Sequence, residues 1–374
     1  MIYADDNADA APRANAWQAY LDATALFADP RAQHACGTDA AQALRAARNR
    51  IARALGTDPD DVVLTSGGTE ANALALTGAL AGQSHAHVVT STLEHPSVER
   101  TLAALEQRGG IDVTRIAADR RGCVQVDAVE AALRTDTRLV SIVFACNETG
   151  VLQPIEGIAR TCRDRGVPVH TDAVQVAGRL PLDVARLGVS TLSLSGHKAG
   201  AVGGIGALVG PGVRALAPLL PRGDAQDLHA ACDNVAGAMS LATALASQNF
   251  GDYAERTAAL RNRLERELLA AVDGITIIGA GSARLPNTSC IIFDGCEGDG
   301  LMMGLDVDGL CVSTGSACST GAIEPSAILM GMGLSVEQAR SAVRISLARD
   351  CGDSDIDALV RAVTSLTRRM RQLG

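Results

Sequence analysis

The chain has 374 residues, of which 47% are hydrophobic and 20% are charged, and its formal net charge is −9. This length suits one large domain or two, and the apolar fraction is sufficient for a sizeable buried core. The acidic balance argues against a nucleic-acid-binding protein, which usually carries a basic face.

The cysteine pattern and the absence of targeting signals indicate a reducing compartment. The N-terminal segment is acidic and has no long apolar run, and no window reaches the roughly 18 apolar residues of a membrane span. Ten cysteines are scattered through the chain without a Cys-x-x-Cys pair, which is typical of reduced thiols that pack as small hydrophobes. We therefore expect a cytoplasmic protein with no signal peptide, no membrane segment, no disulfides and no metal site.

Up to about residue 210, short β-rich runs alternate with helical patterns. The expected strands are 61–65, 87–91, 139–144, 167–171, 191–195 and 206–210. The first clear amphipathic helix has Thr38 as its expected N-cap and Gly56 as its C-cap. This alternation predicts an α/β domain with a doubly wound, mostly parallel sheet.

After about Val235 the pattern changes to an α+β order. One helical stretch runs from residue 236 to residue 272, followed by a strand at 288–293, the segment 310–320 and a strand at 343–347. A final helix begins near Asp355. This order predicts a smaller C-terminal domain.

Lys198 is the only lysine among the 33 Lys and Arg residues. A guanidinium stays charged at any accessible pH, whereas a primary amine can lose its proton and condense with an aldehyde. Lys198 follows a buried-looking strand and precedes a glycine-rich run. The alternative is a chance survivor on the surface, but the position favours a lysine that forms a Schiff base with a cofactor aldehyde.

Three further segments would complete a site for pyridoxal phosphate. SGGTEAN, from Ser66, follows a strand and opens a helix whose free N–H groups favour an anion, although such turns are also common structural punctuation. Asp172 ends another strand, where a carboxylate could hold a protonated pyridine nitrogen or simply cap a helix. His95 also follows a strand, and a lone histidine is more often structural than catalytic.

Cys318 lies in the small-residue segment STGSACSTG, between Gly315 and Gly321. A cysteine in such a loop is a candidate mobile nucleophile, because exposure and flexibility let the thiolate reach a substrate. A neutral filler residue is the alternative.

In order and over nearly the whole chain, these segments resemble the pyridoxal-phosphate-dependent cysteine desulfurases of the class-V aminotransferase group. The matching segments are TSGGTEAN, STLEHPSV, FACNETGVLQPI, TDAVQVAGRLPLDV, SLSGHK, STGSACSTGAIEPSAIL and AVRISLAR. The long form of the cysteine loop resembles the members that serve iron–sulfur cluster assembly and tRNA thiolation. The resemblance implies the aspartate-aminotransferase-like fold type I, a dimer with its active site near the interface, a large domain over 13–250 and a smaller domain over 1–12 and 251–374.

The same resemblance implies a role for each site residue. Lys198 would hold the cofactor and move the Cα proton of L-cysteine, His95 would cover the cofactor ring, and Cys318 would take the sulfur as a persulfide for an acceptor protein. Asn147 and Arg344 would bind the substrate carboxylate. The cofactor itself would be bound by Gly68, Thr69, Asp172 at the ring nitrogen, Gln175 at the phenolic oxygen, Ser195, His197 and Lys198.

Some positions depart from the family pattern. His229 and Cys232 replace the Arg and Thr of an Arg-x-Gly-Thr-x-Asn motif, whose Thr reaches the cofactor phosphate of the partner subunit. Two N-terminal threonines are absent from the segment 6–12, and Gly203 replaces a second lysine. Two alternatives to an active desulfurase therefore stay open: a weakly active or non-catalytic subunit that pairs with a different partner chain, and a selenocysteine lyase. The dimer could be homomeric or heteromeric.

Overall fold

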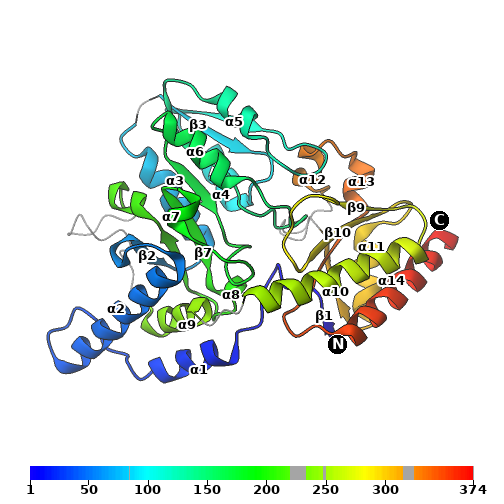
Figure 1. Ribbon diagram of the computed structural model, residues 1–374, viewed down its shortest axis with the longest axis horizontal. Helices are drawn as coiled ribbons and strands as arrows, with labels where there is room; N and C mark the ends of the chain where they lie inside the picture. The colour runs from blue at the N-terminus through cyan, green and yellow to red at the C-terminus, as the bar shows by residue number, and fades with distance from the viewer. Residues whose placement is uncertain (84, 220–232, 247–249, 315–323, 374) are drawn as a thin grey trace.

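The computed structural model describes residues 1–83, 85–219, 233–246, 250–314 and 324–373 (Figure 1). Its largest sheet has seven strands in the order β2-β8-β7-β6-β5-β3-β4. Only β8 runs antiparallel to its neighbours β2 and β7, so the sheet is mostly parallel, as the sequence predicted. The strands are β2 (Val62–Thr65), β3 (Ala86–Ser91), β4 (Ile111–Ile116), β5 (Thr137–Ser141), β6 (Val169–Asp172), β7 (Thr191–Ser195) and β8 (Gly206–Val209).

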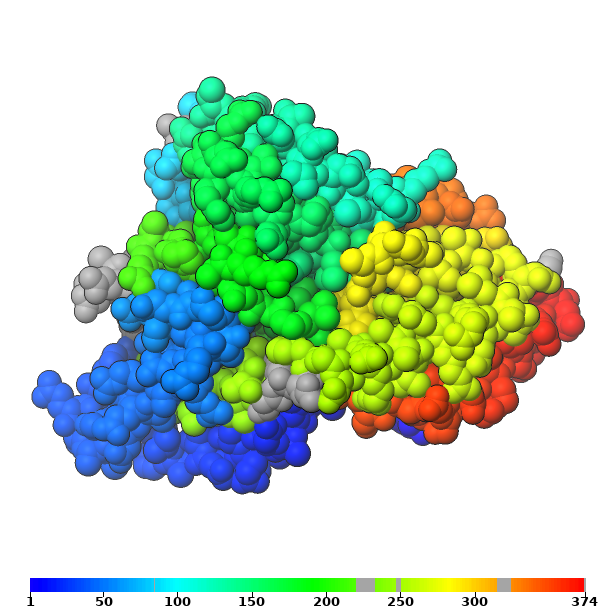
Figure 2. All heavy atoms as spheres, in the orientation of Figure 1, coloured from blue at the N-terminus to red at the C-terminus, as the bar shows by residue number. Residues whose placement is uncertain are grey.

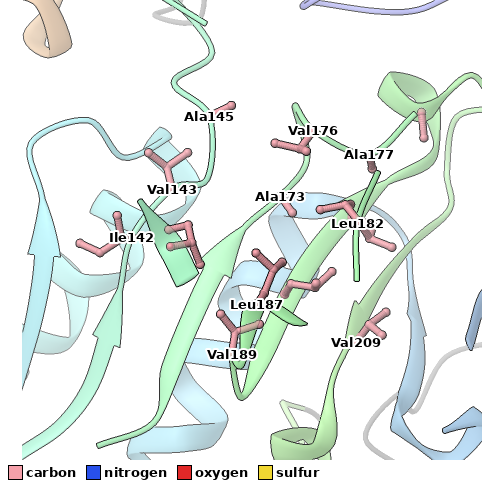
Figure 3. Close-up of a cluster of buried hydrophobic side chains, with 14 of the residues drawn as sticks. Ile142, Val143, Ala145, Ala173, Val176, Ala177, Leu182, Leu187, Val189 and Val209 are labelled. Carbon is pink, nitrogen blue, oxygen red and sulfur yellow. The ribbon is translucent and has the colours of Figure 1, made fainter. Parts of the chain in front are cut away.

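Helices connect these strands and cover both faces of the sheet (Figure 1). Adjacent residues show this directly, because Val88 and Val89 on β3 point to opposite faces and belong to different buried clusters. The helices of this part are α1 (Ala14–Ala23), α2 (Ala35–Leu55), α3 (Gly68–Leu80), α4 (Pro96–Gln107), α5 (Val126–Ala132), α6 (Ile155–Asp164), α7 (Val184–Leu187), α8 (Gly196–Ala199) and α9 (Val235–Ala246). Figure 3 shows part of the larger cluster, in which Ile142, Ala173 and Val209 belong to three different strand regions.

A second, antiparallel sheet of four strands is formed from the C-terminal part of the chain, in the order β12-β13-β10-β9. Its strands are β9 (Ile275–Ile278), β10 (Thr288–Phe293), β12 (Ser313–Thr314) and β13 (Ala342–Ser346), and its helices are α10 (Phe250–Ala271), α11 (Gly298–Val307), α12 (Ala327–Gly331), α13 (Val336–Arg340) and α14 (Asp353–Leu373). The N-terminal strand β1 (Ile2–Tyr3) pairs with β11 (Leu310–Cys311) and joins this part (Figure 1). Because the pairing of β1 with β11 joins the N-terminal residues to the C-terminal part, we propose a division into a domain over 13–250 and a domain over 1–12 and 251–374.

The N-cap predicted for the first amphipathic helix is wrong. Helix α2 begins three residues before Thr38, and the Nδ1 atom of His34 accepts the N–H of Gly37 at 3.2 Å. The Thr38 hydroxyl instead donates to the His34 carbonyl at 3.4 Å, as it does within a helical turn. The predicted C-cap is confirmed, because Gly56 follows the last helical residue with a left-handed φ of 65°.

Two other boundaries differ from the sequence prediction. The strand expected at 139–144 ends at Ser141, because the chain leaves the sheet there to form the wall of a cavity. The helical stretch expected from 236 to 272 consists of α9 and α10, separated by residues 247–249, which lie outside the described part.

The eight cysteines within the described ranges are all unpaired. No helix in that part of the chain combines the length and the apolar character that a membrane crossing requires.

In the space-filling view, the N-terminal helices (blue) and α14 (red) lie at opposite ends of the visible face (Figure 2).

Candidate active site

A cavity of about 380 Å³ lies at the carboxyl ends of the strands of the large sheet, where open α/β sheets bind their ligands. It receives residues from the loops after β2, β3, β5, β6 and β7. Nine of the residues predicted for the site from sequence line it: Gly68, Thr69, His95, Asn147, Asp172, Gln175, Ser195, His197 and Lys198. The other lining residues are Ser66, Gly67, Glu70, Asn72, Ser97, Val143, Ala145, Val174 and Gly204.

The N-terminus of α3 forms one end of the cavity. The first N–H groups of a helix have no partner within the helix and carry a partial positive charge, so they favour an anion. The N-cap residue Gly67 has no side chain to satisfy them, while Glu70 accepts the N–H of Ser66 at 2.7 Å. At Gly68 an added Cβ would lie 2.5 Å from Cγ2 of Val174, so only glycine leaves this end open.

Asp172 lies at the end of β6 and is 4% exposed. Its Oδ1 accepts the backbone N–H of Val174 at 2.9 Å, and its Oδ2 accepts the side-chain amide of Asn72 at 2.7 Å. Gln175, one turn further on, donates to the carbonyl of Asn7 at 3.0 Å and accepts from Arg179 at 3.1 Å. A fixed carboxylate and a fixed carboxamide therefore share one wall of the cavity.

His95 is the N-cap of α4, and its Nδ1 accepts the backbone N–H of Ser97 at 3.1 Å. Burial lowers the pKa of its imidazole, and the nearby Lys198 ammonium lowers it further against the opposing effect of Asp172. His95 therefore both caps α4 and lines the cavity, and its structural role does not exclude a functional one.

Lys198 lies in the single turn α8, directly after β7, and is half-buried in the cavity wall. Beside it, Ser195 Oγ and His197 Nδ1 are 3.2 Å apart. Burial lowers the pKa of His197, and the adjacent Lys198 adds to the effect. The primary amine thus shares one cavity with the carboxylate of Asp172, and the N-terminus of α3 lies at the cavity's end.

Of the two residues predicted to bind a substrate carboxylate, one lines the cavity. Asn147 does so, and its Oδ1 is buried with no hydrogen-bond partner within the described part of the chain. Arg344 lies behind it, 5% exposed, and donates to the Asn147 carbonyl at 3.0 Å and to Asp5 at 2.7 Å. Asn147 therefore separates the Arg344 guanidinium from the cavity, and the guanidinium is paired with Asp5.

Two groups of predicted residues lie outside the described part of the chain. Cys318 belongs to the segment 315–323, and the departures at His229 and Cys232 belong to the segment 220–232. Asn234, at the edge of the second segment, donates to the carbonyl of Gly204 at 3.1 Å and accepts the N–H of Gly237 at 2.8 Å.

Asn72 of α3 and Ser97 of α4 were not predicted from the sequence, although Asn72 contacts Asp172 and Ser97 contacts His95. A signal for Asn72 exists in the sequence, because it follows the anion-favouring turn by one helical turn and so faces the same cavity. Nothing in the sequence connects it with Asp172, which lies 100 residues further along the chain.

The comparisons with known proteins agree with this geometry. The family model described as Aminotransferase class-V matches residues 2–359. A protein from Cereibacter sphaeroides named "Cysteine desulfurase" is 38% identical over 378 residues, which cover 100% of this chain and 97% of that protein. The chain belongs to the cysteine desulfurases of the class-V aminotransferase family.

Two further relatives agree with this assignment. "Cysteine desulfurase IscS" from Anaeromyxobacter sp. is 39% identical over 91% of this chain and 85% of that protein. A solved structure titled "NIFS-LIKE PROTEIN" superposes with a TM-score of 0.91 at 27% identity, covering 98% of this chain and 99% of that one. The predicted fold type I architecture is thereby confirmed, and the names of these relatives favour cysteine desulfuration over selenocysteine lyase activity.

The family uses pyridoxal phosphate, and the residues of the cavity fit this cofactor. The N-terminus of α3, kept open by Gly68, suits a phosphate. Asp172 and Lys198 line the same cavity, so a carboxylate is available for a ring nitrogen and a primary amine for an aldehyde. The unpartnered Oδ1 of Asn147 is a buried polar atom that a ligand would satisfy.

Proposed function

We propose that this chain is a pyridoxal-phosphate-dependent cysteine desulfurase that converts L-cysteine to L-alanine and carries the released sulfur as a persulfide on Cys318. The observation that carries this proposal is that Lys198, the only lysine, shares one cavity with Asp172, His95 and the N-terminus of α3. This supports the same roles that the family resemblance implies.

When bound, pyridoxal phosphate supplies an electron sink for the bonds at Cα and Cβ of the substrate. Lys198 would hold the aldehyde through its amine and afterwards move the Cα proton. Asp172 would accept a hydrogen bond from the ring nitrogen, Gln175 would bind the phenolic oxygen, and His95 would cover one face of the ring. The phosphate would be bound by Gly68, Thr69, Ser195 and His197.

The substrate carboxylate would be bound at Asn147 and Arg344. Because the Arg344 guanidinium is now paired with Asp5 at 2.7 Å, a carboxylate from the cavity would have to compete with Asp5 for it. The buried Nε of Arg344 is a further donor, and no described residue accepts its hydrogen bond. The arrangement supports a bidentate carboxylate site that opens towards Asn147 when substrate binds.

The sulfur step would be carried out by the Cys318 thiolate. Its sulfur attacks the substrate sulfur, so that an S–S bond forms while the substrate Cβ–S bond breaks and leaves its electron pair on the carbon side. Protonation of that carbon gives alanine, and Cys318 keeps a persulfide for transfer to an acceptor protein. We further propose a cytoplasmic enzyme that acts as a homodimer or pairs with a related chain, with sulfur passing to iron–sulfur cluster assembly or tRNA thiolation.

The test is alanine formation from L-cysteine by the purified, cofactor-loaded chain in the presence of a thiol reductant. We expect alanine and sulfide in equal amounts, with loss of both in Cys318→Ala and in Lys198→Arg, which keeps the charge but not the reactive amine. Cys36→Ala is the control, since Cys36 is an unpaired and exposed cysteine to which the proposal gives no role. A wild-type protein that binds the cofactor but forms no alanine would favour the non-catalytic alternative and contradict the proposal.

A further inference from the structure

A buried hydrogen-bonded chain of side chains runs through the wall of the cavity and links three secondary-structure elements. His170 and Asp172 are two residues apart on β6, so their side chains project from the same face of the strand. Asn72 of α3 packs against that face and lies between them, with Oδ1 3.1 Å from His170 Nε2 and Nδ2 2.7 Å from Asp172 Oδ2. His170, Asn72 and Asp172 are 0%, 1% and 4% exposed, respectively.

The orientation of the Asn72 amide follows from what its neighbours can accept. A carboxylate oxygen only accepts, so the NH₂ group of Asn72 must face Asp172 and its carbonyl must face His170. His170 therefore donates from Nε2, while its Nδ1 accepts from the hydroxyl of Thr191 at 2.9 Å. Burial lowers the pKa of His170 to about 4, so at neutral pH it carries the one proton that this arrangement needs.

The second N–H of the Asn72 amide extends the chain to the other side of the cavity. It donates to Ser97 Oγ at 2.9 Å, and that hydroxyl lies 2.8 Å from His95 Nδ1. Because the backbone N–H of Ser97 also points at Nδ1, that nitrogen is an acceptor and the ring proton of neutral His95 is on Nε2. One carboxamide thus connects the carboxylate on one wall of the cavity with the imidazole on another.

We propose that Asn72 is a positioning residue that holds Asp172 in the orientation in which it pairs with the ring nitrogen of the cofactor, and that His170 fixes Asn72 from behind. With Oδ1 held by the Val174 N–H and Oδ2 held by Asn72, the carboxylate cannot rotate about its last torsion without losing a hydrogen bond. Pre-orientation of this kind strengthens an interaction by removing the cost of ordering it on binding. This inference rests on the proposed function, because it takes the bound cofactor to be pyridoxal phosphate.

The experiment compares two ligands that differ only at the position facing Asp172. Cofactor-free wild-type protein and Asn72→Leu are titrated with pyridoxal phosphate and with its analogue in which C–H replaces the ring nitrogen, and the dissociation constants are measured by absorbance. Leucine keeps the number and branching of the asparagine side-chain heavy atoms but cannot donate a hydrogen bond. Because hydrogen bonds to charged groups are among the stronger ones, we expect Asn72→Leu to weaken pyridoxal phosphate binding about tenfold or more while binding of the analogue is unchanged.

Thr77→Val is the matched control on the same helix, since it removes a hydroxyl that only donates to the carbonyl of Ala73, at 2.6 Å. It should leave both dissociation constants unchanged. If Asn72→Leu does not fold, Asn72→Ala, which removes volume without introducing an apolar branch, is expected to show the same selective loss. Equal weakening of both ligands, or no weakening of either, would overturn the proposal, because the effect would then not depend on the ring nitrogen.

The wild-type protein separates this inference from the proposed function. If it binds neither ligand, or binds both equally well, the assignment of Asp172 to the ring nitrogen fails and this inference fails with it. If it prefers pyridoxal phosphate and Asn72→Leu keeps that preference in full, only the positioning role of Asn72 is wrong.

Discussion

Glu148 allows a sharp test of the electrostatics next to the cavity. It is the chain neighbour of Asn147, which lines the cavity, is 5% exposed, and accepts the hydroxyl of Ser326 at 2.6 Å. Burial raises the pKa of its carboxyl from 4.5 to about 7, although the Ser326 hydrogen bond and the Arg344 charge oppose the shift. The native state therefore holds a proton at a pH at which the unfolded chain has released it.

The sign of the pH effect follows from linkage. Because the native pKa is raised, the folded protein loses stability as pH rises from the unfolded value towards the native value, and the loss is constant above it. Glu148→Gln removes this loss while its amide oxygen still accepts from Ser326. From the two pKa values, the stability of Glu148→Gln relative to wild type should rise by about 2 to 3 kcal/mol between pH 5 and pH 8.

Calorimetric Tm values of the cofactor-free proteins at fixed protomer concentration would measure this difference. With an unfolding entropy of about 0.8 kcal/mol/K for a chain of this length, the Tm difference between Glu148→Gln and wild type should grow by about 3 °C from pH 5 to pH 8. Glu130→Gln is the control, because the Glu130 side chain is 53% exposed and its ion pair with Arg165 is at the surface, so this variant should change the Tm little. A Tm difference for Glu148→Gln that does not change with pH would refute the reasoning.

Two further predictions concern the open end of the cavity and a buried ion pair. Gly68→Ala should weaken pyridoxal phosphate binding about tenfold in a titration, because the added Cβ has no room. Gly203→Ala is the control, because its Cβ would meet nothing within 4 Å and should leave the affinity unchanged. Equal affinities of the two variants would contradict the assignment of the phosphate to the N-terminus of α3. Arg179→Met should lower the Tm by about 4 to 6 °C, because it leaves the 6% exposed Asp6 carboxylate without its partner. Arg31→Met, at a pair with side chains 47% and 53% exposed, should change the Tm little, and an equal effect of the two variants would contradict the buried-pair argument.

The sequence predicted the strands of the large sheet well where continuous apolar runs end in polar residues. Parallel strands buried on both faces have such runs, as Val88 and Val89 of β3 and Leu139 and Val140 of β5 show. Strand β4 was missed because it pairs only with β3 and its residues are mostly half-exposed, so its apolar signal is weak. The N-cap at Thr38 was wrong because an imidazole, which composition rules rarely favour, took the capping role at His34.

The sequence was sufficient to predict those site residues whose side chains have a recognisable chemical function of their own. Lys198, Asp172 and His95 each follow a strand, and strands of a parallel sheet bring such residues to one edge. The contacts between these residues were not predictable, because they depend on packing between distant segments. The pairing of Arg344 with Asp5 spans 339 residues and the contact of Asn72 with Asp172 spans 100, and nothing local in the sequence connects the members of either pair.

The central claim is that Cys318 receives sulfur from L-cysteine, and mass spectrometry of the cofactor-loaded protein tests it most directly. After mixing with L-cysteine and rapid alkylation, the peptide that contains Cys318 should carry one additional sulfur atom, and Lys198→Arg should abolish that modification. A Cys318 peptide that never gains sulfur, while alanine is still released, would contradict the account.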